Sequence, residues 1–366
     1  MIRSLQMLIL LFVSCVLFAV NAHAQSAESR VPIEFQGLNA FSSADMSKAF
    51  GEQGLQILKE TNPSQSSINE AANVLKTILA GRGYMDASVV GMRIEGSNVV
   101  RFVVDEGMRY PITSLSFVGN KRFTSDELAS RLRESLANFS DKTKNGYDRE
   151  IVEYSIHQLA NHMRSEGYLQ ARLSEPQIRI VGAGLAITIP ITEGPLYRLG
   201  NLKIDGVKAI SLEEVRSLLP MTKGDVANGE KIGNWLFEDL KRLYGEKGFI
   251  KYTAEPVPLF KNNPRNPEEA TVDFEVQIEE GKQFLLRSLT IEGEFISTKQ
   301  VGEFFVLNVG DVFNQRLLEE SVARINKAGL FEPIDVDKDF KFKTDEENAT
   351  VALMLNLRKK SAADNH

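Results

Sequence analysis

The chain repeats one pattern of apolar and polar positions four times. Each copy opens with a short strand in which apolar residues two apart line one face, and a glycine closes the strand where the chain must turn sharply. These closing glycines are Gly37, Gly119, Gly206 and Gly293. The last three lie 87 residues apart, and such a fixed period indicates an internal repeat.

A helix start follows every one of these strands. A hydroxyl residue with an acidic or amide residue three positions later can satisfy the free N–H groups of a helix's first turn. The four pairs are Ser42 with Asp45, Thr124 with Glu127, Ser211 with Glu214, and Ser297 with Gln300. An amphipathic helix then ends in each copy at a left-handed glycine cap and an apolar residue. These endings are Gly83-Tyr84, Gly167-Tyr168, Gly248-Phe249 and Gly329-Leu330.

Two further alternating strands complete each copy, and three copies then end in Glu-Gly, at Glu106, Glu193 and Glu280. The order is therefore β-α-α-β-β, which predicts an α+β fold. In each copy two helices cover one face of a three-stranded sheet. We expect four such modules in tandem, over 31–108, 109–195, 196–281 and 282–358, followed by a short tail at 359–366.

The first residues predict a signal peptide over 1–24. An apolar run from Leu8 to Val20 precedes Ala22-His23-Ala24, which has small residues at the two positions that a signal peptidase reads. The run is short for a membrane span of about 20 residues, so we expect no transmembrane segment in the mature chain. A lipoprotein signal at Cys15 and an uncleaved anchor are the alternatives. Cleavage at the expected site would remove the one cysteine.

Composition and charge narrow the class of protein. With 43% apolar residues, the 366-residue chain can bury ordinary globular cores. Its 43 Lys and Arg residues are outnumbered by 49 Asp and Glu residues, for a formal net charge of -6. Nucleic-acid binders usually carry a basic surface, so we expect no nucleic acid as a partner.

No set of residues has the spacing of a catalytic or metal site. His157 and His162 are five apart, so they diverge on a helix. The triplet Gly182-Ala183-Gly184 lies between predicted strands, which favours a hairpin turn over a nucleotide-binding loop. Trp235 is one position off an apolar stripe, which favours packing at the edge of a core.

One acidic segment imitates a calcium loop through Asp335, Asp337, Asp339 and Glu346. Phe340 stands where such a loop needs glycine, so we interpret the segment as an exposed strand and turn. We therefore predict no enzyme activity, no cofactor and no metal.

Three motifs resemble the polypeptide-transport-associated (POTRA) repeat of BamA-type outer-membrane assembly factors and two-partner secretion channels. They are Leu115-Ser116-Phe117-Val118-Gly119-Asn120, Gly167-Tyr168 and Glu193-Gly194-Pro195. The resemblance covers about 110–358, and 324–331 is similar to the last repeat before a barrel. Because the sequence ends soon after Leu357, we expect no barrel in this chain and a separate outer-membrane β-barrel protein as a partner.

The resemblance implies that the second strand of each module is an edge that accepts a client strand. It follows the glycine–aromatic pair, beginning with 85–89 in the first module. In the other modules the candidate client-binding residues are Leu169, Gln170, Ala171, Arg172, Leu173, Ile250, Lys251, Tyr252, Thr253, Ala254, Ile334, Asp335 and Val336.

The sequence leaves two functions open. In the first, the chain is a non-enzymatic periplasmic scaffold at the inner face of the outer membrane. It would bind extended segments of unfolded outer-membrane or secreted polypeptides by β-augmentation. In the second, the repeats are a spacer or assembly module whose helix faces dock folded partner subunits, such as a separate barrel.

Overall fold

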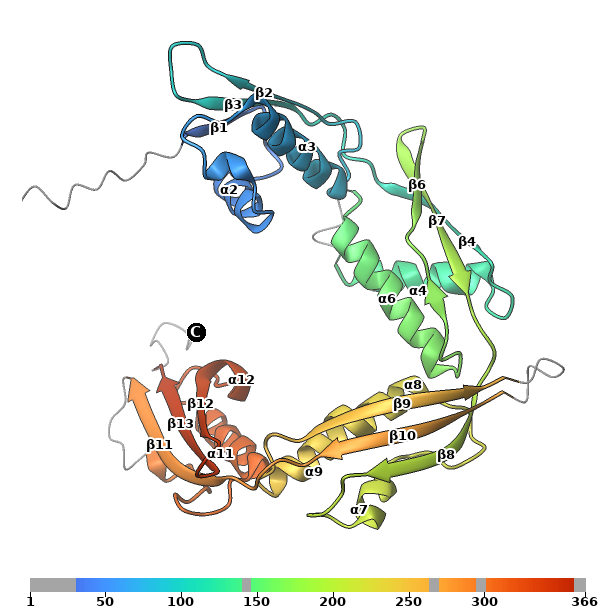
Figure 1. Cartoon of the computed structure of the whole chain (residues 1–366), viewed down its shortest axis with the longest axis vertical. Helices are drawn as coiled ribbons and strands as arrows, with labels where there is room; N and C mark the ends of the chain where they lie inside the picture. Colours follow the sequence, from blue (N-terminus) through green and yellow to red (C-terminus); the bar gives the residue numbers. More distant parts are fainter. Residues whose placement is uncertain (1–30, 140–145, 263–269, 294–300, 359–366) are drawn as a thin grey trace, which may run out of the picture. The chain divides into compact units, whose positions relative to one another are not determined.

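The computed structural model describes residues 31–139, 146–262, 270–293 and 301–358 (Figure 1). The predicted signal peptide, the tail and the fourth capping box, Ser297 with Gln300, lie outside these ranges. The chain divides into two compact units, and the boundary between them runs through the second predicted module. No helix of the described ranges has the length and apolar character that crossing a membrane requires.

The first module contains one sheet in the order β1-β3-β2, with β1 parallel and β2 antiparallel to the central β3. Figure 1 shows α3 running along this sheet. Ser42 forms the complete predicted capping box with Asp45 at the start of α2. The elements are β1 (Ile33–Gln36), α2 (Ser43–Glu52), the 3-10 turn η1 (Gln56–Leu58), α3 (Gln65–Gly81), β2 (Ser88–Arg93) and β3 (Val100–Asp105).

The second module has a four-stranded sheet, in which β4 and two short strands, β5 and β6, all pair with β7. Its elements are β4 (Ile112–Val118), α4 (Ser125–Ala137), α6 (Arg149–Ser165), β5 (Arg172–Leu173), β6 (Gln177–Val181) and β7 (Gly184–Thr192). A turn at Gly182, whose φ is +59°, joins β6 to β7. The predicted hairpin is confirmed.

Two prolines explain why this edge is split. Leu173 pairs with Ile191 and Gln177 pairs with Thr188, so the register shifts by one residue between β5 and β6. Ser174 donates its N–H to the Pro190 carbonyl over 2.9 Å, but Pro190 has no N–H to return. The edge therefore bulges at residues 174–176, which include Pro176.

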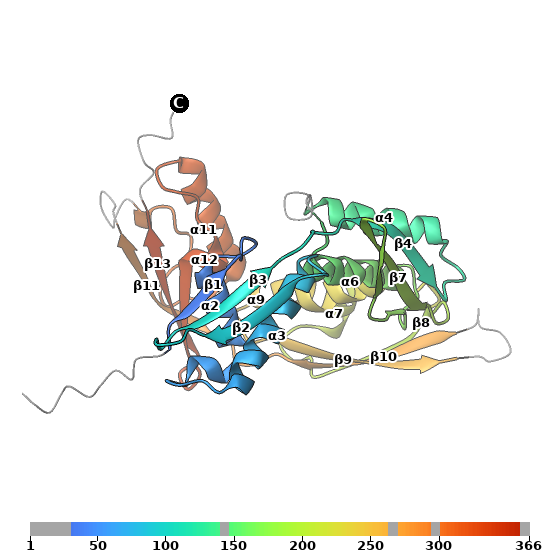
Figure 2. The ribbon, with the colours of Figure 1, turned by 90° about the horizontal axis from the view of Figure 1, so that it is seen from above.

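The third module repeats the order of the first, as β8-β10-β9. Its elements are β8 (Arg198–Asp205), α7 (Leu212–Ser217), α8 (Gly229–Asn234), the π-helical segment η2 (Trp235–Asp239), α9 (Leu240–Glu246), β9 (Thr253–Lys261) and β10 (Thr271–Glu279). Figure 2 shows β9 and β10 side by side, and they pair over nine residues each. Trp235 is 1% exposed and donates to the Val215 carbonyl, so it lies within the core rather than at its edge.

The fourth module has the same order, β11-β13-β12, with β11 (Leu285–Gly293), α11 (Gln315–Ala328), the short α12 (Val336–Asp339), β12 (Phe340–Asp345) and β13 (Thr350–Leu357). Apolar side chains of the helices and of the inner sheet face form the core of this module, as they do in the first and third. The four sheets confirm the α+β fold class. The second module differs from the prediction in having four strands instead of three, and the module bounds remain a prediction.

The strand-closing glycines are required because the central strand passes very close to them. A Cβ atom on any of the four would lie 2.0–2.3 Å from a main-chain oxygen of that strand, and all four have φ between +84° and +116°. The oxygens belong to Val104, Ile191, Ile278 and Leu357. A side chain would therefore separate the first strand from the central one.

The glutamates of the Glu-Gly pairs bind the loop that follows the first strand. The Glu193 carboxylate accepts the N–H groups of Lys121, Arg122 and Phe123 at 2.8–3.1 Å. Glu280 accepts those of Lys208 and Ala209 at 2.9–3.0 Å. Both glutamates are buried, so each loop amide that they bind would otherwise lack an acceptor.

The same interaction recurs in the first module, where Glu106 accepts the N–H groups of Asn39 and Ala40 at 2.6 and 2.7 Å. In the third module the Tyr244 hydroxyl also donates to Glu280 over 2.9 Å. Burial and this carboxylate together raise the pKa of Tyr244, so the phenol remains a donor. The carboxylate thus joins a strand, a loop and a helix.

Each module is hydrogen-bonded to the next through its helix-capping glycine. Tyr110 donates its N–H to the Gly83 carbonyl over 2.9 Å. The matching bonds run from Tyr197 to Gly167 and from Phe284 to Gly248, at 3.0 and 2.9 Å. A residue within the first three positions of a module therefore also completes the helix end of the module before it.

We predict that Gly206→Ala destabilises the protein by about 2 kcal/mol or more, because alanine is strained at φ +89° and its Cβ would strike the Ile278 oxygen. The matched control is Gly233→Ala in α8, where a Cβ meets nothing within 4 Å. We expect the control to be neutral or stabilising by up to about 1 kcal/mol. Chemical unfolding followed by circular dichroism measures both, and equal effects would contradict the packing argument.

We also predict that Glu280→Ala lowers the free energy of unfolding by about 2–4 kcal/mol. It leaves two main-chain donors and the Tyr244 hydroxyl without their acceptor. Glu279→Ala, at the exposed neighbouring position, should change it by less than about 0.5 kcal/mol. Urea titrations of the two variants make the comparison, and a small loss for Glu280→Ala would show that the loop is held by other contacts.

Candidate functional site

The second strand of each module lies at an edge of its sheet. The third strand is central in every sheet, so β2, β9 and β12 each pair on one side only in the described part of the chain. In the second module β5 and β6 share this edge. An edge strand presents unpaired main-chain N–H and C=O groups, which can pair with an extended segment of another chain.

The strand predicted over 169–173 is wrong for its first three residues. Leu169 and Gln170 form a turn, Ala171 is buried with 1% exposure, and only Arg172 and Leu173 form β5. The strand predicted over 85–89 likewise begins three residues late, at Ser88.

The strand predicted over 250–254 is displaced in the same direction. Ile250 and Lys251 form a turn, and β9 begins only at Thr253, which Ala254 follows. Tyr252 precedes the strand, and its ring stacks on Tyr244 with centroids 4.6 Å apart. Its hydroxyl donates to the Leu236 carbonyl over 3.0 Å, and burial raises the pKa of Tyr252. The Tyr252 side chain therefore packs against the core of the third module instead of lying in the edge strand.

The strand predicted over 334–336 is not a strand. Ile334 is buried, Asp335 caps α12, and Val336 is the first residue of that helix. The edge strand of the fourth module is β12, which begins at Phe340. The segment resembling a calcium loop begins with this helix, since the Asp335 carboxylate accepts the N–H groups of Asp337 and Lys338. The rest of the segment forms β12 and the turn after it, as predicted.

A second turn explains the displacement in the first three modules. The aromatic residue after the capping glycine accepts an N–H from three residues later, which keeps the chain folded for one more turn. These bonds run from Ala87 to Tyr84, from Ala171 to Tyr168 and from Tyr252 to Phe249, at 2.8–3.2 Å. The glycine–aromatic pair therefore marks two turns, and the sequence pattern had indicated only one.

The four edges are chemically different, although the modules repeat. The β2 edge has no proline and exposes Val90 and Met92. The β9 edge contains Pro256 and Pro258. On the remaining edges, β12 carries the exposed residues Lys341 and Lys343, and β5 and β6 are separated by the bulge at 174–176.

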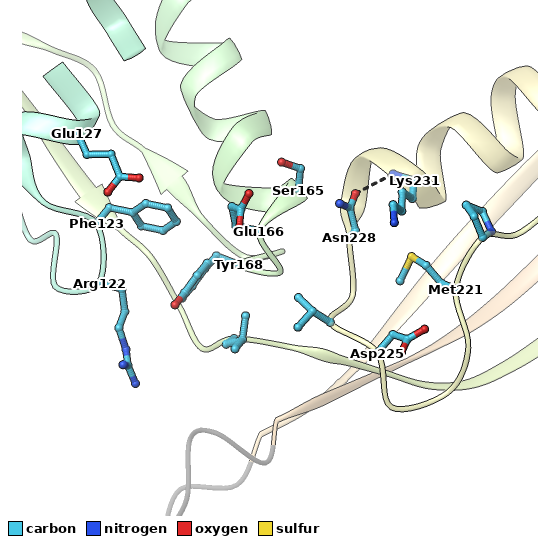
Figure 3. Close-up of a pocket in the computed structure, with 13 residues that line it drawn as sticks. Arg122, Phe123, Glu127, Ser165, Glu166, Tyr168, Met221, Asp225, Asn228 and Lys231 are labelled. Carbon is cyan, nitrogen blue, oxygen red and sulfur yellow. Dashed lines mark hydrogen bonds between the residues drawn. The ribbon is translucent and has the colours of Figure 1, made fainter. Parts of the chain in front are cut away.

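A cavity of about 640 Å³ lies beside the turn that contains Tyr168 (Figure 3). Phe123 and Tyr168 pack edge to face at its wall, with ring centroids 5.1 Å apart. Met221 lies across from them, and charged residues of both signs, such as Glu166 and Lys231, form the rim. The cavity can receive an apolar side chain of a partner protein if polar residues flank that side chain.

His157 and His162 do not form a metal site, and within the described ranges no three His, Cys, Asp or Glu side chains are grouped as metal ligands. His162 packs edge to face against Phe123, with ring centroids 6.3 Å apart.

Comparisons with known proteins agree with the fold. Residues 110–194 and 197–281 match the POTRA family model, the surface antigen variable number repeat. The chain is 23% identical over 287 residues to outer membrane protein assembly factor BamA of Neisseria meningitidis, covering 75% of this chain and 35% of the relative. For BamA of Nitratidesulfovibrio vulgaris the identity is 24% over 262 residues, covering 67% of this chain and 32% of the relative.

Among solved structures, POTRA domains 3–5 of Haemophilus influenzae BamA superpose with a TM-score of 0.55 at 19% identity. The match covers 68% of this chain and 96% of that one, which shows a common fold. The chain spans about a third of the length of the curated relatives named above. Residues 110–194 and 197–281 thus match POTRA repeats, and the resemblance of the chain to BamA-type assembly factors is confirmed.

Proposed function

We propose that the chain is a non-enzymatic scaffold in outer-membrane protein assembly that binds extended client segments by β-augmentation. The observation that carries this proposal is the strand order, which leaves the second strand of every module at an edge. The similarity to outer membrane protein assembly factors supports a role in outer-membrane protein assembly. Clients would be unfolded outer-membrane or secreted polypeptides.

Main-chain pairing gives each edge a weak and broad affinity. Four or five ladder bonds contribute roughly 2–7 kcal/mol before the client loses its conformational freedom. One edge alone should therefore bind at around millimolar concentration. Several edges on one chain would raise the apparent affinity by avidity, and pairing through the main chain tolerates many client sequences.

The proposed location is the periplasm, at the inner face of the outer membrane. The predicted signal peptide supports export, and the similarity to BamA supports the association with outer-membrane assembly. The proposed partners also include a separate outer-membrane protein that receives the clients.

A second candidate function is the docking of folded partner subunits, with the modules as a spacer. The cavity beside Phe123 and Tyr168 favours this candidate, because an apolar wall with a charged rim is typical of small protein–protein contacts. The two functions differ in which surface the partner contacts.

Site-specific photocrosslinking tests the proposal in the full chain. A photoreactive residue replaces one exposed apolar residue on each edge, and the matched controls are Tyr154 and Phe237 on helices. All six positions are between 44% and 57% exposed. The four edge positions are Val90, Ile180, Val257 and Phe342.

The probe is a urea-unfolded outer-membrane porin, diluted into buffer with each variant. We expect at least one edge position to crosslink the porin about tenfold more strongly than the helix positions, because only an edge can add a strand. Equal yields at edge and helix positions would reject β-augmentation. If a reactive group at Lys231 instead captures one folded protein in stoichiometric amount, the docking function is favoured.

A further inference from the structure

We infer that β2 of the first module is the principal acceptor edge, and that Pro256 and Pro258 close the longest edge, β9. This inference rests on the proposed function and assigns it to one strand. It follows from the main-chain groups that each edge leaves unpaired and from the side chains beside them.

The main chain of β2 faces outward at every second residue. Ile94 donates its N–H to the Val99 carbonyl over 3.0 Å, which identifies the hydrogen-bonded pairs of the β2–β3 ladder. Because such pairs alternate along an antiparallel ladder, the N–H and C=O groups of Val89, Gly91 and Arg93 point away from β3. The residues that follow Val89 and Gly91, which are Val90 and Met92, have exposed apolar side chains.

Those two side chains make the edge suitable for an apolar client strand. Val90 is 57% exposed and Met92 is 42% exposed. They lie on the face opposite α3, because a Cβ at the intervening Gly91 would lie 2.5 Å from Ile68 of that helix. A client with an apolar residue at every second position would bury them by cross-strand contact.

The helix also holds this edge in place. The Arg93 guanidinium donates to the Asn62 side chain and to the Pro63 carbonyl, both just before α3. The strand is therefore tied to the helix at the end where its hairpin begins, and a client would meet a preformed edge.

On β9, by contrast, two main-chain donors are missing. Pro256 and Pro258 are two residues apart, so their nitrogens face the same side of the strand. The β9–β10 register continues unbroken across both prolines, as expected where the ring nitrogens face the open side. At Pro190, which has paired strands on both sides, the register shifts instead.

The other two edges are less suited to an apolar strand. Lys341 and Lys343 give β12 two exposed charges, a common means of discouraging edge pairing. The edge made by β5 and β6 is interrupted at 174–176, so neither part offers more than five consecutive residues.

The experiment uses the full chain and a photoreactive ten-residue peptide of alternating valine and threonine, with crosslinks mapped by mass spectrometry. In the unsubstituted chain we expect about tenfold more crosslinks to 88–93 than to 253–261, because β9 lacks two ladder donors. The double variant Pro256→Val with Pro258→Thr should raise the β9 yield about tenfold. Equal initial yields, or no gain in the double variant, would overturn the inference while edge binding itself stands.

Two variants of β2 complete the test. Val89→Pro removes one outward donor, and Val90→Lys with Met92→Lys changes only exposed side chains, so the second variant reports even if the first fails to fold. Each should lower the β2 yield about tenfold, with thermal unfolding as the control for folding. Unchanged β2 yields in a folded Val90→Lys, Met92→Lys protein would reject β2 as the apolar acceptor. Absence of crosslinks at all four edges would reject the proposed function instead.

Discussion

The acceptance of loop amides by a glutamate at the end of the central strand is the interaction on which each of the first three modules depends. The carboxylate of Glu106, Glu193 or Glu280 fixes the loop between the first strand and the first helix. In these modules the fixed loop joins the closing glycine, which lies against the central strand, to the first helix. The second strand remains as the unpaired edge. In the fourth module no Glu-Gly pair follows the central strand, and Arg358 stands directly after Leu357.

The sequence predicted the order of helices and strands along the chain and the class of fold because these depend on local periodicity. The edge position of the second strand was implied by the resemblance to POTRA repeats. Alternation of apolar residues, a capping box such as that of Ser42, and a glycine cap act within a few residues. The positions of the edge strands depended on contacts that periodicity does not report. Ala171 and Tyr252 follow the glycine–aromatic pairs and were therefore predicted in strands, yet the turn bonds to Tyr168 and Phe249 keep them out of the ladder.

The role of the Glu-Gly pairs shows a similar limit. Their 87-residue spacing was visible, but the loop that each carboxylate binds lies about 70 residues earlier in the chain. The prolines of β9 were also visible in the sequence. Their effect follows only from the β9–β10 register, which places two missing N–H donors on the open side of β9. The repeat therefore gives the modules a common strand order, while different residues along the edge strands make the edges unequal.

The bonds from Tyr110, Tyr197 and Phe284 to the preceding capping glycines also constrain how such proteins can be recombined. In each case the donor lies three positions after the glycine of the Glu-Gly pair. A module can be exchanged for another only if this three-residue step is kept, because a longer or shorter connection moves the donor away from its carbonyl. If modules are exchanged by duplication or engineering, a boundary placed directly after the Glu-Gly pair keeps this connection intact.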